Sequence, residues 1–275
     1  MIIIKAAYRR LFFKYTNMAI NVNTVYTTVL SILNKEQRGY LTPYEFNQLA
    51  TQVQLEIFES YFENLNQQLR VGENSSEYAN RVKTLREKIA RFEVEEDITV
   101  AIVNGIGVGD LTTLTNPVHR LGTLHSERFN YLPVEIEQAT KHQFNSIRRS
   151  NLTQPSAEWP VYYKEGNTVK ILPGVATAAG PPAVQVYSVE YVKKPADVVW
   201  AYEVGALNQY IWDGTPGAVG PFIPALGSVS FEIDDTDQTE LILKILMYAG
   251  VVVRDQEIVQ AAAGAAAQAD QLQSS

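Results

Sequence analysis

The longest periodic stretch of the sequence runs from Thr42 to Arg70 and predicts one long helix. Thr42 and Glu45 fit a capping box, in which each side chain bonds the other residue's backbone N–H. Pro43 suits the first helical position, where its missing N–H costs nothing. Apolar residues recur at three- or four-residue steps and form one stripe along a helix of about 40 Å. The stripe consists of Phe46, Leu49, Val53, Ile57, Tyr61, Leu65 and Leu69.

Three further helices are predicted around this one. A short helix over Asn21–Asn34 precedes it, and a charged helix with an apolar stripe over Tyr78–Phe92 follows it. The short connection Val71–Ser76 favours an antiparallel arrangement of the long helix and its successor, with facing stripes. A last helix starts at the capping residues near Asp235 and is apolar nearly all round from Leu241, so we expect it to be central.

The middle of the chain carries β signals. The run Val161–Lys164, a glycine-containing turn and the run Thr168–Leu172 predict a hairpin, and Ala183–Val192 predicts a third strand. Three antiparallel strands with one apolar face form a small sheet that packs on helices. Ile98–Val103 and Pro117–Leu124 are also strand-like. Pro133–Arg149 begins with proline and glutamates and ends with arginines, which predicts a helix.

The predicted fold class is therefore α+β: a long antiparallel helical hairpin or bundle, an inserted small antiparallel β-sheet domain, and a C-terminal return helix. The expected boundaries are a basic arm or mis-assigned start at 1–18, a first bundle part at 19–97, a mainly β insert with one helix and a Gly/Pro-rich arm at 98–232, the return helix at 233–262 and a flexible tail at 263–275.

Composition excludes several classes of protein. The formal net charge of −7 argues against a free-standing nucleic-acid binder, because such proteins rely on a basic surface. The chain has no cysteine and 3 histidines, so disulfides, thiolate zinc sites and histidine metal centres are not expected. His119 and His125 lack a third ligand. No apolar run reaches the roughly 18 residues of a membrane span. We expect no cofactor and no metal.

One stretch mimics a calcium loop. Asn34, Glu36, Arg38, Gly39, Thr42 and Glu45 occupy the positions of an EF-hand loop. Arg38, however, stands where an oxygen ligand should be, and its guanidinium would oppose a divalent cation. A corner between two helices, with Gly39 in a left-handed conformation, is the favoured interpretation.

No catalytic motif is present. The sequence lacks G-x-S-x-G, H-E-x-x-H and a phosphate-binding loop, and GIGVGD at 105–110 is interpreted as a flexible turn. Glu95–Glu96 and Asp234–Asp235 are adjacent pairs at element ends, which is typical of solvated caps. We predict that the protein is not an enzyme. The alternative from that class is a hydrolase built from separated carboxylates that no motif marks.

The first 17 residues, MIIIKAAYRRLFFKYTN, interleave basic and apolar side chains. Arg9 and Arg10 interrupt the apolar core that a secretory signal needs. Two interpretations stay open. The stretch is either a basic amphipathic arm that contacts something acidic, or the consequence of a start codon assigned upstream of the true first residue, Met18.

The Gly/Pro-rich stretch Asp213–Ser228 is predicted to be irregular. Its apolar residues Phe222, Ile223 and Leu226 need cover, which either a neighbouring subunit or the chain's own core supplies. As subunit-interface residues we predict these three together with four from the long helix. Those four are Phe46, Val53, Ile57 and Tyr61.

Three segments together are similar to virion proteins of tailed bacteriophages. They are the helical pair at 23–70, the strands within EWPVYYKEGNTVKILP and VQVYSVEYVKKP, and the closing DQTELILKILMYAGVVVRDQEIVQAA. Their order and texture over residues 19–262 resemble the head-to-tail connector proteins (ring, adaptor or tail-tubular-like) of short-tailed and crAss-like phages.

This resemblance implies a structural virion protein. It would be a subunit of a ring, usually twelvefold, at the head-to-tail junction below the portal, and DNA would pass through the ring during genome ejection. Its partners would be copies of itself, the portal protein and tail or ring proteins, with assembly in the host cytoplasm, no specific DNA binding and no membrane. An acidic balance suits a channel wall that lets DNA slide. Another phage component, a minor capsid or tail protein, is the alternative.

Overall fold

The chain folds into two compact units. The barrel unit is Ile89–Lys194, and the helical unit combines Met1–Lys88 with Pro195–Ser275. The structure is a computed structural model that describes residues 20–35, 40–71, 76–126, 134–150, 152–156, 159–174, 184–213 and 227–252, together with 264 and 267–268.

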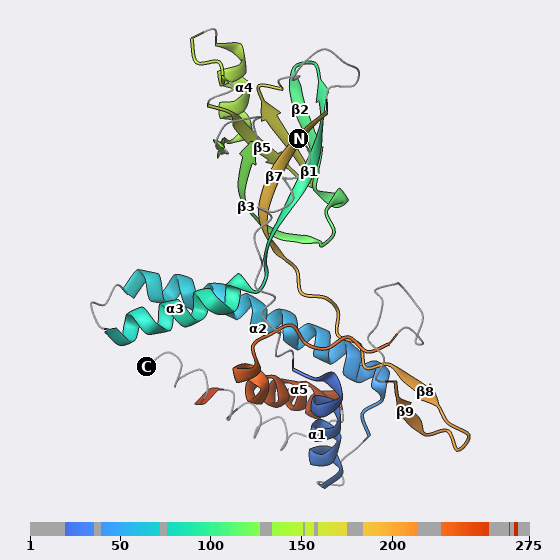
Figure 1. Cartoon of the computed structure of the whole chain (residues 1–275). Helices are drawn as coiled ribbons and strands as arrows, with labels where there is room; N and C mark the ends of the chain where they lie inside the picture. The colour runs from blue at the N-terminus through green and yellow to red at the C-terminus, as the bar shows by residue number, and fades with distance from the viewer. Residues whose placement is uncertain are drawn as a thin grey trace, which may run out of the picture. The chain divides into compact units, whose positions relative to one another are not determined.

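The helical unit is built around α2, Pro43–Val71, which is 29 residues long. Helix α5, Gln238–Val252, packs against α2 and also contacts α1, Val22–Lys35 (Figure 1). A 3₁₀ turn, η2 at Asp235–Asp237, leads into α5, and α3 spans Ser76–Ala90. The long helix and its capping box are confirmed: the Thr42 N–H donates to Glu45 at 3.0 Å, and the Glu45 N–H donates to the Thr42 hydroxyl at 3.3 Å.

The core of the helical unit forms where α1, α2 and α5 present their apolar faces to one another. Extended segments of the chain also border this core. They are joined by two isolated antiparallel bridges, Ile20 with Phe231 and Val199 with Val229. The fully buried core residues include Val25, Val29, Leu33, Phe46, Val53, Ile57, Phe58, Phe231, Ile233, Leu241 and Ile245. A separate two-stranded sheet, β8 at Tyr202–Val204 and β9 at Tyr210–Trp212, extends from this core.

The barrel unit is a closed barrel with the strand order β1-β2-β6-β5-β4-β3-β7. All neighbours pair antiparallel except β4 and β5, which pair in parallel. The strands are β1 Glu93–Val103, β2 Ile106–Asp110, β3 Val118–Ser126, β4 Val134–Gln138, β5 Val161–Glu165, β6 Thr168–Leu172 and β7 Val184–Lys193. A 3₁₀ turn, η1 at Leu111–Thr113, follows β2, and Asp110 caps it through a 2.9 Å bond from the Thr112 N–H, which lowers the pKa of Asp110.

The barrel is filled with apolar and aromatic side chains, among them Ile98, Val100, Leu124, Ile136, Val169, Ile171, Tyr187, Val189 and Tyr191. Burial raises the pKa of Tyr187 to about 12. Two glycines of β2 make room for this packing. A Cβ on Gly107 would lie 2.8 Å from Val100, and one on Gly109 would lie 3.0 Å from the same side chain. The barrel therefore has a packed interior.

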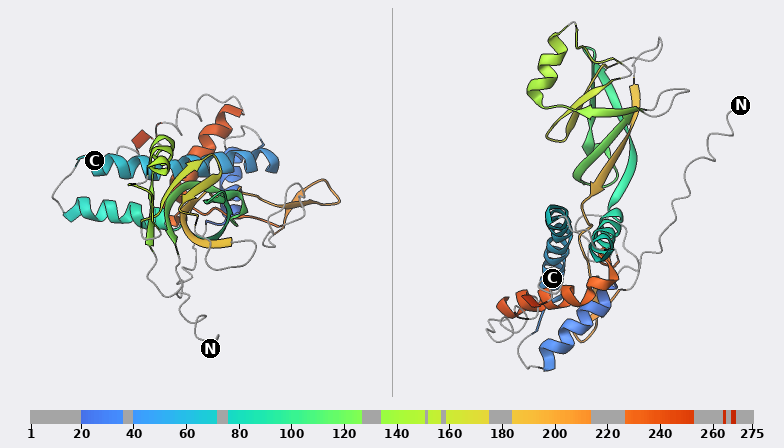
Figure 2. Two further views of the ribbon diagram at one scale, coloured as in Figure 1. Left: turned by 90° about the horizontal axis from the view of Figure 1, so that it is seen from above. Right: turned by 90° about the vertical axis from the view of Figure 1, so that its left-hand side faces the viewer.

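Helix α4, Lys141–Arg149, lies against the outside of the barrel beside β5 (Figure 2). Phe144 packs into a second cluster with Val161, Tyr163 and Leu172. The first three residues of β5 are therefore buried on both faces: Tyr162 points into the barrel, while Tyr163 packs on Phe144 of α4 and Val161 belongs to the same outer cluster.

The closed barrel overturns the predicted fold class. The expected helical hairpin or bundle with a small antiparallel sheet insert is wrong, because seven strands close on themselves. The predicted hairpin at 161–172 is present as β5 and β6, but the third strand, β7, pairs with β1 and β3 instead of with that hairpin. Residues 106–110, interpreted as part of a flexible turn, form β2, a strand of the barrel wall whose glycines leave room for the Val100 side chain.

The predicted helix over Pro133–Arg149 is also wrong in its first half. Val134–Gln138 forms strand β4, whose Ile136 points into the barrel. The helix begins later, after Thr140, which forms a capping box with Gln143. The glutamates of VEIEQ alternate with apolar residues, and this period of two outweighed the preference of glutamate for a helix start.

Candidate interaction surface

Helix α2 holds an extended segment of the chain through a row of polar side chains. Asn47, Thr51 and Gln54 lie three or four residues apart and therefore share one face of the helix. Asn47 accepts from the Trp200 N–H at 2.8 Å, and Thr51 accepts from the Val198 N–H at 3.0 Å. Because the bonded residues alternate, the segment at 196–200 runs along α2 as a strand would.

Gln54 fixes this segment most firmly. Its side chain is fully buried, and its amide donates to the Ala196 carbonyl at 2.7 Å. The amide oxygen of Gln54 accepts from the Glu232 N–H at 2.9 Å. A buried amide with both ends bonded thus reinforces the tie between two segments that pair with each other only at the Val199–Val229 bridge.

A row of aromatic rings continues from the core along the same segment. Phe46 packs on Tyr26 with centroids 4.8 Å apart, and Tyr26 packs on Trp200 at 4.3 Å. The Tyr26 hydroxyl donates to the Leu41 carbonyl at 3.2 Å. Burial, followed by the neighbouring Tyr40, raises the pKa of Tyr26, so this donor stays protonated. The Trp200 indole N–H donates to Asn23 at 3.1 Å. All polar groups at the inner end of the row are thus bonded.

The outer end of the row reaches the surface. Tyr202 stacks on Trp200 at 5.9 Å and meets Tyr210 edge-on at 4.8 Å. Tyr40 stacks on Tyr210 at 6.5 Å. Tyr202 lies at the base of this hairpin, where it pairs with Trp212, and Tyr210 pairs with Val204 beside the turn. The row of rings therefore contacts the hairpin at both ends and holds it in a defined direction.

A polar clasp holds the other side of the hairpin base. The Trp212 indole N–H donates to the Ser228 hydroxyl at 2.9 Å, and that hydroxyl donates to the Asp213 carbonyl at 2.7 Å. The Asp213 N–H in turn donates to the Ala201 carbonyl at 2.9 Å. At the tip, the Gly205 N–H donates to the Gln209 carbonyl at 2.8 Å, and Asn208 takes a positive φ of 57° to close the turn.

The hairpin itself is exposed and apolar. Leu207 at the tip is 87% exposed and Val204 is 60% exposed. Tyr210, Ile211 and Trp212 of β9 are also exposed large hydrophobic residues. We call Val204, Leu207, Tyr210, Ile211 and Trp212 the hairpin surface. In the part of the chain that the structure describes, β8 and β9 pair with each other only.

The exposed apolar residues lie on both faces of the hairpin, with Ile211 and Glu203 on one face and Val204, Tyr210 and Trp212 on the other. Large apolar side chains gathered in the open on one short element mark a site of association. A two-stranded sheet is marginally stable by itself in water, and its two edges offer unpaired backbone groups. The hairpin surface is suited to binding another macromolecule.

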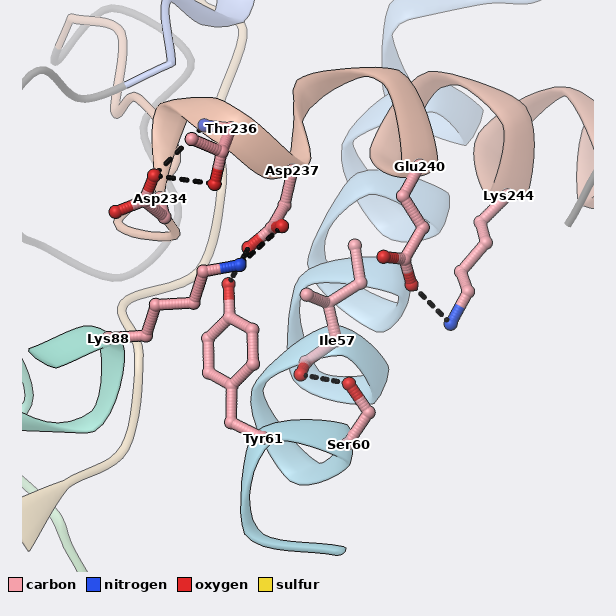
Figure 3. A network of polar contacts seen from close by, with 9 residues as sticks. All are labelled: Ile57, Ser60, Tyr61, Lys88, Asp234, Thr236, Asp237, Glu240 and Lys244. Atoms are coloured by element: carbon pink, nitrogen blue, oxygen red, sulfur yellow. Dashed lines mark hydrogen bonds and ion pairs between the residues drawn. The ribbon is translucent and has the colours of Figure 1, made fainter. Parts of the chain in front are cut away.

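The helical unit also contains a buried charge network (Figure 3). Asp237 is 6% exposed, accepts a hydrogen bond from Tyr61, and accepts from the Lys88 ammonium at 2.7 and 2.8 Å. Burial, then the charge of Asp237, raises the pKa of Tyr61, so its hydroxyl remains a donor. Each oxygen and the ammonium have partners, so this network joins α2, α3 and η2 and is structural.

The predicted interface residues of α2 lie inside the helical unit. Phe46, Val53 and Ile57 are fully buried and Tyr61 is 4% exposed, so they pack against their own chain. An apolar stripe at helical spacing has the same signature whether it faces a core or a partner. The predicted arm residues Phe222, Ile223 and Leu226 lie outside the described residues, as does the basic arm.

Sequence reasoning did not single out the hairpin surface. Its signal was present: Tyr202–Val204 and Tyr210–Trp212 are β-formers that flank a Gly- and Asn-containing turn. What the sequence did not reveal is exposure, because alternation within strands of three residues is too short to tell a buried face from a solvated one.

Among the described residues, no three acidic or histidine side chains gather as a metal-binding group. His125 lies 3.7 Å from Glu190, and Glu45 is bonded to Thr42. No helix in the described part of the chain combines the length and the apolar character that crossing a membrane requires.

When the chain is compared with known proteins, no protein-family model matches it and no curated protein matches its sequence.

Proposed function

We propose that this protein is a structural subunit of a ring, the head-to-tail connector of a tailed bacteriophage, placed below the portal and open to the passage of DNA. The ring assembles from copies of the chain and binds the portal above and tail proteins below. DNA passes without specific contacts.

The observation that carries this proposal is the hairpin surface. A monomer that works alone has little reason to expose several large apolar side chains on a hairpin whose base is so firmly fixed. In a ring, each subunit presents a surface that a different surface of its neighbour covers, and closure by rotation then covers this surface in every copy. The order of segments that resembles connector proteins points the same way, as does the acidic charge of −7, which disfavours tight binding of DNA.

Sedimentation velocity and negative-stain electron microscopy of the purified full-length chain test the proposal. We expect closed rings that sediment far above the chain mass of 30.7 kDa. Ile211→Asp should abolish them, since it places a charge in the hairpin surface. Gln52→Asp, which adds the same charge at an exposed position of α2, should assemble as the unmodified chain does. A chain that stays monomeric at about 100 μM, roughly a hundredfold above a micromolar Kd, contradicts the proposal.

A further inference from the structure

A second exposed apolar feature lies on the barrel unit. Trp159 is 77% exposed and Leu152 is 94% exposed. Both belong to the connection between α4 and β5, whose turns are defined by local bonds. The Thr153 N–H donates to the Ser150 hydroxyl at 3.3 Å, and the Trp159 N–H donates to the Ser156 carbonyl at 3.1 Å.

The contacts of α4 place two arginines at this connection. Lys141 in its first turn pairs with Glu165 at the end of β5, and Phe144 packs on Tyr163 with centroids 4.6 Å apart. The helix therefore runs antiparallel to β5. Its last turn, with Arg148 and Arg149, lies toward the start of that strand, which directly follows Trp159 and Pro160. We call Arg148, Arg149, Leu152 and Trp159 the α4 face.

The α4 face has the composition of a binding hot spot. Tryptophan and arginine are the residues most enriched among those that dominate association energies. Arg148 and Arg149 are exposed, and within the described residues neither forms an ion pair. Helix α4 contains no acidic residue, and the connection at 150–160 contains one, Glu158, so the two arginines leave an excess of positive charge. The surface is thus apolar with a positive rim.

The hairpin surface has the complementary character. Glu203 is exposed and is the only charged residue within Tyr202–Trp212. That surface is apolar with a negative charge, whereas the α4 face is apolar with positive charges. The two belong to different compact units.

We propose that the hairpin surface of one copy docks on the α4 face of the next copy, and that this contact closes the ring. The inference rests on the proposed function and names the contact that builds the assembly. Because two different surfaces meet, the interface is heterologous, and repetition of one such contact produces a ring once the rotation closes. Glu203 then lies among Arg148 and Arg149, and Trp159 packs against Ile211, the apolar residue of β9 that pairs with Glu203 and shares its face of the hairpin.

Nucleic acid is the competing occupant of the α4 face, because arginines and an exposed tryptophan also bind phosphates and bases. Charge does not favour it: basic residues do not exceed acidic ones in Ile89–Lys194, whereas nucleic-acid-binding domains are strongly basic. A nucleic-acid partner would also leave the hairpin surface uncovered. The second copy covers both surfaces in one contact.

The absence of cysteine allows a direct test by cross-linking. Leu207→Cys and Leu152→Cys each change one exposed leucine and leave the core intact. The two single variants, distinguished by mass tags, are mixed and treated with a short bismaleimide. The mixture excludes cross-links within one chain. We expect the mixed dimer as the main product and little homodimer of either variant.

Charge exchange makes the test specific. Glu203→Arg in the Leu207→Cys chain should lower the yield of mixed dimer about threefold to tenfold, the range for partly exposed ion pairs. Arg149→Glu in the Leu152→Cys chain should restore it. In the unmodified background, Trp159→Ala should weaken association about thirtyfold, as truncation of a hot spot does. Val103→Ala, which trims a 53% exposed barrel residue, should leave association unchanged.

Each contrary result has its own meaning. If Ile211→Asp abolishes the rings while Trp159→Ala does not, the ring stands and the α4 face is not its receptor. Homodimers of Leu207→Cys as the main product would mean that hairpins pair with hairpins. Loss of binding to a 30-bp DNA duplex by Trp159→Ala, with association intact, would assign the face to nucleic acid. An unmodified chain that never associates overturns both proposals.

Discussion

The Tyr61 hydroxyl donates a hydrogen bond to the carboxylate of Asp237, a residue 176 positions later in the chain (Figure 3). Lys88 binds both oxygens of the same carboxylate, and its ammonium lies 5.3 Å from the centroid of the Tyr61 ring. This contact holds the start of the last helix against α2 and α3. The helical unit that presents the hairpin surface therefore depends on charges that the hydrophobic core encloses.

Asp237→Ala should destabilise the helical unit by about 3–5 kcal/mol, because it leaves the largely buried ammonium of Lys88 without its partner. Tyr61→Phe removes one hydrogen bond to a charged group and should cost about 1.5–3 kcal/mol. Urea denaturation followed by circular dichroism measures both. Asp235→Ala, at an exposed position of the same turn, is the control and should cost less than about 1 kcal/mol. Equal losses for Asp235 and Asp237 would contradict this role.

Gln54→Ala should cost about 2–4 kcal/mol. The substitution strips partners from the Ala196 carbonyl and the Glu232 N–H, and each unsatisfied buried group costs about 1–3 kcal/mol. Hydrogen exchange should report faster opening at 196–200, since this segment then lacks its firmest bond to α2. Gln52→Ala, exposed on the same helix, should change stability by no more than about 0.5 kcal/mol. A Gln54 variant as stable as this control would show that the segment is held by its apolar contacts alone.

Phe144→Ala should release α4 from the barrel. The Phe144 side chain is 2% exposed and is the main apolar contact of that helix, so its removal should cost the barrel unit about 3–5 kcal/mol. Thermal unfolding of the full chain measures the loss. Asn145→Ala, the exposed neighbour, is the matched control. If the α4 face binds the hairpin of the next copy, Phe144→Ala should also weaken association between copies, because it loosens the helix that carries this face.

Glu165 should make the stability of the barrel unit depend on pH in the acidic range. Hydrogen bonds from Lys141, Lys170 and Tyr163 lower the pKa of Glu165 to about 2. A carboxyl whose pKa is lower in the folded than in the unfolded state stabilises the fold above the unfolded value, near 4.5, and loses that contribution as the pH falls toward 2.

Glu165→Gln should therefore lower the melting temperature at pH 7, and its difference from the unmodified chain should shrink between pH 4.5 and pH 2. Scanning calorimetry across this range measures the difference. Glu137→Gln, exposed on the neighbouring strand, should show no comparable trend. A constant difference at all pH values would mean that the carboxylate charge is not what Glu165 contributes.

The sequence alone determined those helices and hairpins whose capping residues, turn residues or apolar spacing lie within one short segment. The capping pair Thr42–Glu45 and the stripe behind it specify α2, because a helix is defined by bonds and side-chain spacing within one segment. The hairpin at 161–172 was recognisable for the same reason. The repeated polar spacing of Asn47, Thr51 and Gln54 was also visible, but its purpose required knowing which segment crosses the helix.

Tertiary structure alone decided how the strands close and which apolar residues face solvent. Barrel closure depends on pairings such as β1 with β7, which join residues far apart in sequence, and no local period encodes a partner. Exposure is equally a property of the assembled chain. Phe46 and Ile211 are both large apolar residues, yet Phe46 lies at the centre of the helical unit and Ile211 on its outside. The hydrophobic effect favours burial of both, but it is not directional and does not specify which surface covers each residue.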